Sequence, residues 1–158
     1  MEDVKVCIKQ EEKSGVNSFF TSKRVVEVAV VEDNKLFNLI LSNELSSAVN
    51  KIKNRKDCTI NFSNFHKGTD FLNFLEDPKN RNSKIIVFSD YYLEDEMNGA
   101  VILKRIKQKE INARVVITSD ITNKQTSEDT LKIGALRFIP KDINTPLICS
   151  EMLYQLLD

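Results

Sequence analysis

IIVFSDYYLEDEMNG, residues 85–99, begins as a buried strand and ends as a cluster of polar groups. The four consecutive apolar residues from Ile85 to Phe88 are typical of a strand that is covered on both faces. The run ends at Ser89 and Asp90, and three more acids follow before Gly99. A carboxylate at the end of a core strand is exposed while its backbone stays rigid, which suits a functional group. Other polar residues at this end of the fold are therefore candidates for the same site.

The rest of the chain alternates between β-rich runs and helical patterns of apolar residues. Strands are predicted at 25–31, 58–62, 84–90, 113–119 and 135–140, and helical stripes at 37–52, 71–75, 101–106, 122–133 and 147–156. Asn98 is the predicted N-cap of the third helix, and Thr145 that of the last, with Pro146 at its first position. Five strands that alternate with five helices predict an α/β fold with a parallel sheet covered on both faces.

Residues 1–24 are polar and have no sustained periodicity, so we interpret them as an extension that precedes one domain at 25–158. For this extension, disorder and a short strand at VKVCI (4–8) are the two alternatives. The 23 basic and 23 acidic residues balance, so neither nucleic acid nor a membrane surface is a predicted partner. No apolar run is long enough to span a bilayer, and no signal peptide is visible. The three scattered cysteines, Cys7, Cys58 and Cys149, indicate reduced thiols and a cytoplasmic location.

Several kinds of enzyme site are excluded by the composition. The chain has one histidine, His66, which is too few for the common zinc sites, and a surface loop is its expected place. Its four glycines stand alone, so neither GxGxxG nor a P-loop occurs. Phosphatases and nucleases that use two aspartates in a DxD motif are excluded as well, because Tyr92 stands two places after Asp90.

Polar residues follow four of the five predicted strands, and parallel strands end at one edge of a sheet. These residues are Glu32, Asp33, Asp90, Thr118, Ser119 and Lys141. Taken singly, Asp33 is better explained as a helix cap, Thr118 as an ordinary strand residue and Lys141 as a solvated side chain. Their joint placement favours a shared site. Crowded carboxylates favour Mg2+, and a carboxylate beside Mg2+, a lysine and a threonine is equipped to receive a phosphoryl group.

Five segments together resemble the receiver domain of bacterial two-component response regulators, of the chemotaxis-regulator type. They are VVED (30–33), the strand that ends at Asp90, MNG (97–99), IT (117–118) and GALRFIPK (134–141). The resemblance runs from about Val25 to Asp158. It implies a doubly wound, flavodoxin-like sheet in the order 2-1-3-4-5, an order that comes from the family rather than from this sequence.

The resemblance also implies a role for each acidic residue. Asp90 would be the phosphoacceptor, taking its phosphoryl group from a phosphohistidine on a sensor histidine kinase or a histidine phosphotransfer protein. Asp33 and Asp90 would bind Mg2+ directly, and Glu32 would act chiefly through water. The backbone carbonyl of Tyr92 would complete the protein ligands.

Three further residues have implied roles in the response to phosphorylation. Lys141 would pair with a phosphoryl oxygen, Thr118 would move to hydrogen-bond it, and Phe138 would follow as the aromatic switch. The result would be a changed surface for a downstream protein effector, and a homodimer is left open. On this interpretation the chain is not an enzyme beyond its own phosphorylation and dephosphorylation.

Two departures from the family pattern support an alternative function. Gly99 lies nine places after Asp90 where receivers usually have eight, and the usual proline of that loop is absent. Asp142 follows Lys141 where receivers typically have a proline in a cis bond. A cis bond before another residue costs about 2.5–4 kcal/mol, so the turn is expected to differ or to be strained. The alternative is a degenerate receiver that docks onto partners without phosphorylation.

Overall fold

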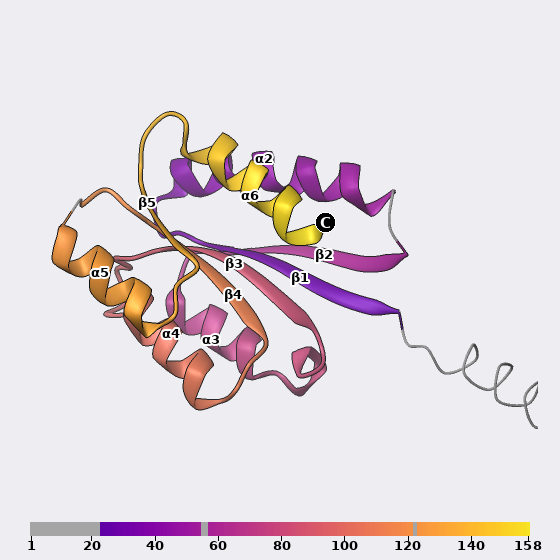
Figure 1. Ribbon diagram of the computed structural model, residues 1–158, viewed down its shortest axis with the longest axis horizontal. Helices are drawn as coiled ribbons and strands as arrows, with labels where there is room; N and C mark the ends of the chain where they lie inside the picture. Colours follow the sequence, from indigo (N-terminus) through magenta and orange to yellow (C-terminus); the bar gives the residue numbers. More distant parts are fainter. Residues whose placement is uncertain (1–22, 55–56, 122) are drawn as a thin grey trace, which may run out of the picture.

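Five parallel strands form the central sheet of the computed structural model, which describes residues 23–54, 57–121 and 123–158 (Figure 1). The strand order is β2-β1-β3-β4-β5, which confirms the doubly wound topology expected from the resemblance. The strands are β1 (Arg24–Val31), β2 (Cys58–Phe65), β3 (Lys84–Asp90), β4 (Ala113–Ser119) and β5 (Arg137–Pro140). All neighbouring pairs are parallel, so the carboxyl ends of the strands meet at one edge.

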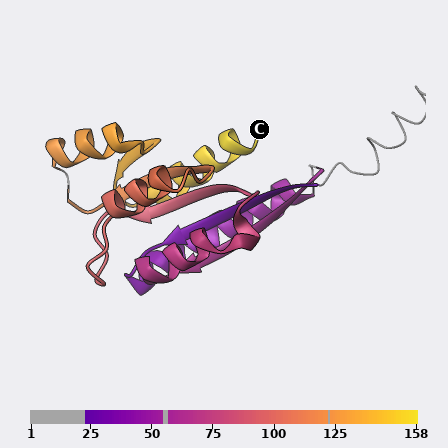
Figure 2. The same cartoon turned by 90° about the horizontal axis from the view of Figure 1, so that it is seen from below.

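Helices cover both faces of the sheet, as Figures 1 and 2 show. One face carries α2 (Lys35–Lys53) and α6 (Thr145–Leu157). The other carries α3 (Gly68–Glu76), α4 (Gly99–Gln108) and α5 (Lys124–Ile133), with a short 3-10 turn, η1 (Pro78–Asn80), after α3. The predicted alternation of strands and helices is therefore confirmed.

Two hydrophobic cores follow from the alternation of side chains along each strand. On β1, Val28 and Val30 belong to the core beneath α2 and α6, whereas Ala29 and Val31 belong to the core above α3 and α4. The same alternation holds on β3 for Ile85 to Phe88. Burial on both faces explains why these strands are near-continuous apolar runs in the sequence.

The predicted boundaries need small corrections. β1 begins one residue early, at Arg24, and β2 continues to Phe65. β5 begins at Arg137 rather than at residue 135, because the backbone N–H of Ala135 donates to the Thr130 carbonyl at the end of α5.

Thr145 is not the N-cap of the last helix. Asn144 occupies that position, and Thr145 is already helical. The hydroxyl of Thr145 accepts a hydrogen bond from the backbone N–H of Asp142 (2.8 Å) and donates one to the carbonyl of Pro140 (3.2 Å). It therefore closes the turn before the helix instead of capping the helix itself.

The structure describes His66 and two of the three cysteines for which the sequence makes predictions. His66 is exposed in the bend after β2, as expected of a surface residue. Cys58 and Cys149 are free thiols. Cys7, the segment VKVCI and Thr122 lie outside the described residues. No helix in the described part of the chain is long and apolar enough to cross a membrane.

Candidate functional site

A cavity of about 280 Å3 lies at the carboxyl edge of the sheet. It is lined by the loops that follow β1, β3, β4 and β5, through Glu32, Asp33, Asn34, Asp90, Tyr92, Glu94, Asp120, Ile121 and Lys141. The predicted acids, Tyr92 and Lys141 are therefore brought to one place. Thr118 and Phe138 do not line this cavity.

Three carboxylates crowd this cavity. Oxygen atoms of Glu32, Asp33 and Asp90 lie within 4.8 Å of one another. Glu32 and Asp90 are buried, and Asp33 is half-buried. Two charges at such a separation repel by roughly 4 kcal/mol at an effective dielectric constant near 20. The arrangement therefore favours a bound cation, and an all-oxygen set suits Mg2+.

Lys141 supplies one positive charge from the end of β5. Its ammonium lies 2.6 Å from Glu32 Oε2 and 3.2 Å from Asp90 Oδ2, and its side chain is 5% exposed. It also lies 4.7 Å from the centre of the Phe37 ring. Interpreting Lys141 as a solvated loop residue is therefore wrong. Burial would lower its pKa, but the hydrogen bond to Glu32 and the charge of Asp90 outweigh burial, so the pKa of Lys141 is raised.

Burial dominates the titration of the two buried acids. Desolvation raises the pKa of Glu32 from 4.5 to about 7, with the Asp90 charge adding to the rise and Lys141 opposing it. Desolvation also raises the pKa of Asp90, where Lys141 again opposes it and Asp33 adds to it. One lysine therefore does not fully offset the burial of these carboxylates.

Asp33 is not the cap of the helix that follows it. The N-cap of α2 is Asn34, whose side chain accepts a hydrogen bond from the Phe37 N–H at 2.9 Å. Asp33 Oδ2 instead accepts a hydrogen bond from the backbone N–H of Glu94 at 2.8 Å. The second oxygen of this carboxylate remains available for a cation in the cavity.

The segment after Asp90, which carries the extra residue noted in the sequence, forms a narrow hairpin. Tyr92 pairs antiparallel with Asn98, and the Leu93 N–H donates to the Met97 carbonyl at 3.1 Å. Glu96 takes a left-handed conformation, with φ at 60°, at the tip of this turn. Asn98 caps α4 through the Val101 N–H, as predicted.

Tyr92 contributes its backbone to the site. Its N–H hydrogen-bonds the Asp90 carboxylate and works against the rise in the pKa of Asp90. The role of its carbonyl as a metal ligand remains a prediction.

The two predicted switch residues lie beside the site on β4 and β5. Thr118 is buried opposite Asp90 in the β3–β4 register, and its hydroxyl lies 3.5 Å from the Ser89 carbonyl. Phe138 is half-buried, and its ring centre lies 6.4 Å from that of Tyr91. A surface hollow adjoins Phe138 at the start of α5. Thr118 thus lies one strand from the carboxylate, and Phe138 lies on the next strand out.

The turn after Lys141 lacks the proline that receivers typically have, and it is formed without a left-handed backbone conformation at Lys141 or Asp142. The bond between Lys141 and Asp142 is trans, and neither residue has a positive φ. The Lys141 N–H donates to the Ser119 carbonyl at 2.8 Å, and the Asp142 N–H to the Thr145 hydroxyl. These bonds hold Lys141 in place without the proline.

Sequence reasoning missed a buried amide that supports the site. Asn38 on α2 donates to the carbonyl of Glu32 (2.8 Å) and to that of Phe65 (3.1 Å), so it ties the ends of β1 and β2 together. The signal was a polar residue within the apolar stripe between Phe37 and Leu41. Asp120 was also missed, and its carboxylate lies 3.8 Å from the Lys141 ammonium.

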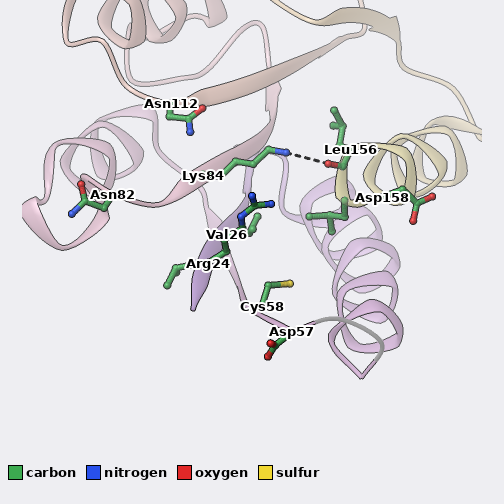
Figure 3. Close-up of a pocket in the computed structure, with 11 residues that line it drawn as sticks. Arg24, Val26, Asp57, Cys58, Asn82, Lys84, Asn112, Leu156 and Asp158 are labelled. Carbon is green, nitrogen blue, oxygen red and sulfur yellow. Dashed lines mark hydrogen bonds between the residues drawn. The ribbon is translucent and has the colours of Figure 1, made fainter. Parts of the chain in front are cut away.

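A larger cavity, of about 740 Å3, lies at the opposite edge of the sheet (Figure 3). Its lining includes the first residues of β1, β2 and β3, which are Arg24, Cys58 and Lys84. Lys84 donates to the Leu156 carbonyl at 3.2 Å. This cavity contains none of the predicted site residues, so the smaller acidic cavity is the better candidate.

Comparisons with known proteins agree with this geometry. The family model for response regulator receiver domains matches residues 28–152. A two-component response regulator of Arabidopsis thaliana is 31% identical over 133 residues, which are 83% of this chain but 19% of that protein. The chain therefore spans about a fifth of the length of this curated relative.

Solved structures share the fold. The signal receiver domain of NarL from Mycobacterium tuberculosis superposes with a TM-score of 0.65 at 20% identity, covering 86% of this chain and 98% of that one. The receiver domain of the Francisella response regulator 1452 gives a TM-score of 0.63 at 19% identity, covering 84% and 98%. The BeF3-activated receiver domain of DrrB gives 0.61 at 21% identity, covering 83% and 96%.

Proposed function

The chain belongs to the family of response regulator receiver domains, and from this premise we propose that Asp90 accepts a phosphoryl group in a Mg2+-dependent reaction. The observation that carries the proposal is the cluster of Glu32, Asp33 and Asp90 around the buried ammonium of Lys141. Asp90 is the nucleophile in this proposal because it ends the central strand β3 and contacts Lys141 directly.

The proposed reaction moves one phosphoryl group between two side chains. A carboxylate oxygen of Asp90 attacks the phosphorus of a phosphohistidine, an oxygen–phosphorus bond forms and the nitrogen–phosphorus bond breaks. The leaving imidazole keeps the electron pair of that bond and takes up a proton. Lys141 offsets negative charge on the phosphoryl oxygens. Asp33, Asp90 and Glu32 would hold Mg2+, which when bound neutralises charge on the phosphoryl group.

The donor proposed here is a sensor histidine kinase or a histidine phosphotransfer protein. Exposed apolar side chains lie on the helices that follow β1 and β5: Leu36, Leu39 and Ile40 on α2, Ile143 before α6 and Leu147 on α6. A second hollow, lined by Leu36, Phe37 and Ile40, shares Asn34, Asp120 and Lys141 with the acidic cavity. An apolar surface beside a reactive carboxylate suits a protein donor that packs helices against it.

The degenerate receiver remains the second candidate. Its support is the lengthened loop and the Lys141–Asp142 pair. The acidic cluster and the buried Lys141 favour the phosphoacceptor, because a docking surface alone needs neither. In either case we propose a cytosolic signalling domain rather than an enzyme with a separate substrate.

Incubation with acetyl phosphate tests the proposal. We expect wild-type protein to gain one acid-labile phosphoryl group in the presence of Mg2+, seen by intact mass, and to gain none in EDTA. Asp90→Asn should remain unmodified in both conditions, because the amide is not a nucleophile. An unmodified wild-type protein that binds no Mg2+ would favour the degenerate receiver.

Phosphorylation is also expected to loosen or reposition α5. Its only buried residue in the described structure is Thr130, so few apolar contacts hold this helix. Elements of low local stability are the ones that switch. We expect hydrogen exchange to change across β4, α5, β5 and α6 when the protein is phosphorylated, through Thr118 and Phe138. Changes confined to residues 91–99 would show that the signal leaves through another surface.

A further inference from the structure

The hairpin after Asp90 rests on the first turn of α3. Asp95 Oδ2 accepts hydrogen bonds from the backbone N–H of Thr69 (2.9 Å) and from its hydroxyl (3.0 Å). The N-cap position of α3 is held by Lys67, which makes no side-chain capping bond. Asp95 therefore supplies, from another part of the chain, the acceptor and the negative charge that stabilise a helix N-terminus.

Packing holds the same hairpin against the helix. Leu93 is buried in the core, and Met97 packs against that core. Gly68 makes this approach possible, because a Cβ there would lie 2.7 Å from the Met97 Cβ and 3.0 Å from the Leu93 Cδ1. The contact between hairpin and helix is therefore close, and a side chain at position 68 would push the two apart.

Titration of Asp95 agrees with a fixed contact. Burial would raise its pKa, but the hydrogen bonds from the backbone and side chain of Thr69 and from the backbone of Gly68 outweigh burial. The pKa of Asp95 is therefore lowered. The carboxylate is charged at neutral pH and attracted to the start of α3.

The opposite side of the hairpin faces the acidic cluster. The residue just before Asp95 donates its backbone N–H to Asp33 Oδ2 at 2.8 Å. The backbone N–H of Tyr92, two residues before Glu94, donates a hydrogen bond to the Asp90 carboxylate. One short segment thus contacts α3 through a side chain and two of the predicted metal ligands through its backbone.

We propose that Asp95 is a positioning residue for the metal site: by fastening the hairpin to α3, it holds the Glu94 amide against Asp33. This inference rests on the proposed function, because it assumes that Asp33 binds Mg2+. Groups that orient metal ligands through hydrogen bonds typically contribute 10–100-fold to metal affinity. The alternative is that Asp95 only caps α3, in which case its loss lowers stability and leaves the site unchanged.

Mg2+ affinity, measured by calorimetric titration well below the unfolding midpoint, separates these two roles. We expect Asp95→Ala to weaken Mg2+ binding by about tenfold and to speed hydrogen exchange at the Glu94 amide. Asp95→Asn keeps an oxygen acceptor for Thr69 and should recover most of the affinity. The matched control is Glu96→Gln, since Glu96 is an exposed acid of the same hairpin whose side chain makes no hydrogen bond or ion pair among the described residues.

Unchanged Mg2+ affinity in an Asp95→Ala protein that melts lower than wild type would overturn the inference and leave a helix cap. If Asp95→Ala does not fold, Thr69→Val is the deciding variant, because it removes one of the two hydrogen bonds to Asp95 and should weaken Mg2+ binding by a few-fold. A Thr69→Val protein with wild-type Mg2+ affinity would equally overturn the inference. If Glu96→Gln weakens Mg2+ binding to the same extent as Asp95→Ala, the loss of negative charge alone explains both results, and the inference is wrong. A wild-type protein that binds no Mg2+ would instead refute the proposed function.

Discussion

Lys141→Met is expected to lower the free energy of unfolding by about 3–5 kcal/mol in EDTA near neutral pH, the usual cost of removing one partner from a buried ion pair. The lysine is the cation that contacts both Glu32 and Asp90 within the described site. Methionine has a similar length and keeps the packing on Phe37, so the loss should come from the uncompensated carboxylates. Urea unfolding of the two proteins measures it.

The loss should depend on pH. Between pH 4.5 and about 7, Glu32 holds a proton in the folded state that it has lost in the unfolded chain. The free energy of unfolding therefore falls as pH rises through this window. Without the lysine the pKa values of Glu32 and Asp90 should rise further. The variant's free energy of unfolding should therefore differ least from that of wild type near pH 4.5 and most above about pH 7.

The matched control for this variant is Lys107→Met, an exposed lysine on α4. It should change the free energy of unfolding by less than about 0.5 kcal/mol at any pH. A loss in Lys141→Met that is the same at both ends of the pH window would show that packing, and not charge, is what Lys141 contributes.

Asp90→Asn is expected to unfold at a higher temperature than wild type in EDTA, although it cannot be phosphorylated. Burial and the Asp33 charge raise the pKa of Asp90 in spite of Lys141, so at neutral pH its carboxylate costs the folded state free energy. The neutral amide removes this cost, and about 1 kcal/mol would raise the midpoint by roughly 2–4 °C in a chain of this size.

Mg2+ should reverse the order of the two melting curves or narrow the gap between them. A ligand that binds only the native state stabilises it by mass action, and wild type has one more carboxylate for the cation. Calorimetric melts of both variants, with EDTA and with millimolar Mg2+, provide the comparison. If Asp90→Asn melts lower in EDTA and Mg2+ shifts neither protein, the three acids do not act as one site.

The sheet was predictable because its strands carry their own signal. Burial on both faces makes β1, β3 and β4 into near-continuous apolar runs, and their residue ranges were predicted to within one residue. Element ends were less predictable where long-range bonds decide them. Thr145 has the side chain of an N-cap, but its hydroxyl is taken by Asp142 and Pro140 of the preceding turn.

The acids of the site were predictable for a topological reason. Parallel strands bring their carboxyl ends together whatever lies between them in the sequence, so Asp33, Asp90 and Lys141 could be placed at one edge. The same reasoning could not show that Asn34 caps α2 and leaves Asp33 free for the site. That outcome depends on the turn between β1 and α2.

The hairpin was recognised in the sequence only as an extra residue and three acids. Which acid serves a structural purpose depends on the fold, because Thr69 lies 26 positions away from Asp95. Nothing in the local pattern separates Asp95 from Glu94 and Glu96. The structure separates them: Asp95 is bound to α3, the backbone of Glu94 holds Asp33, and Glu96 forms the tip.

The position of the phosphoryl group tests the central claim most directly. Wild-type protein is treated with acetyl phosphate and Mg2+, the acyl phosphate is reduced with borohydride, and the modified residue is identified by peptide mass mapping. We predict that the reduced residue is Asp90 and that omitting Mg2+ abolishes the modification. Reduction at Asp33 or Asp120 instead, or equal modification with and without Mg2+, would contradict the account.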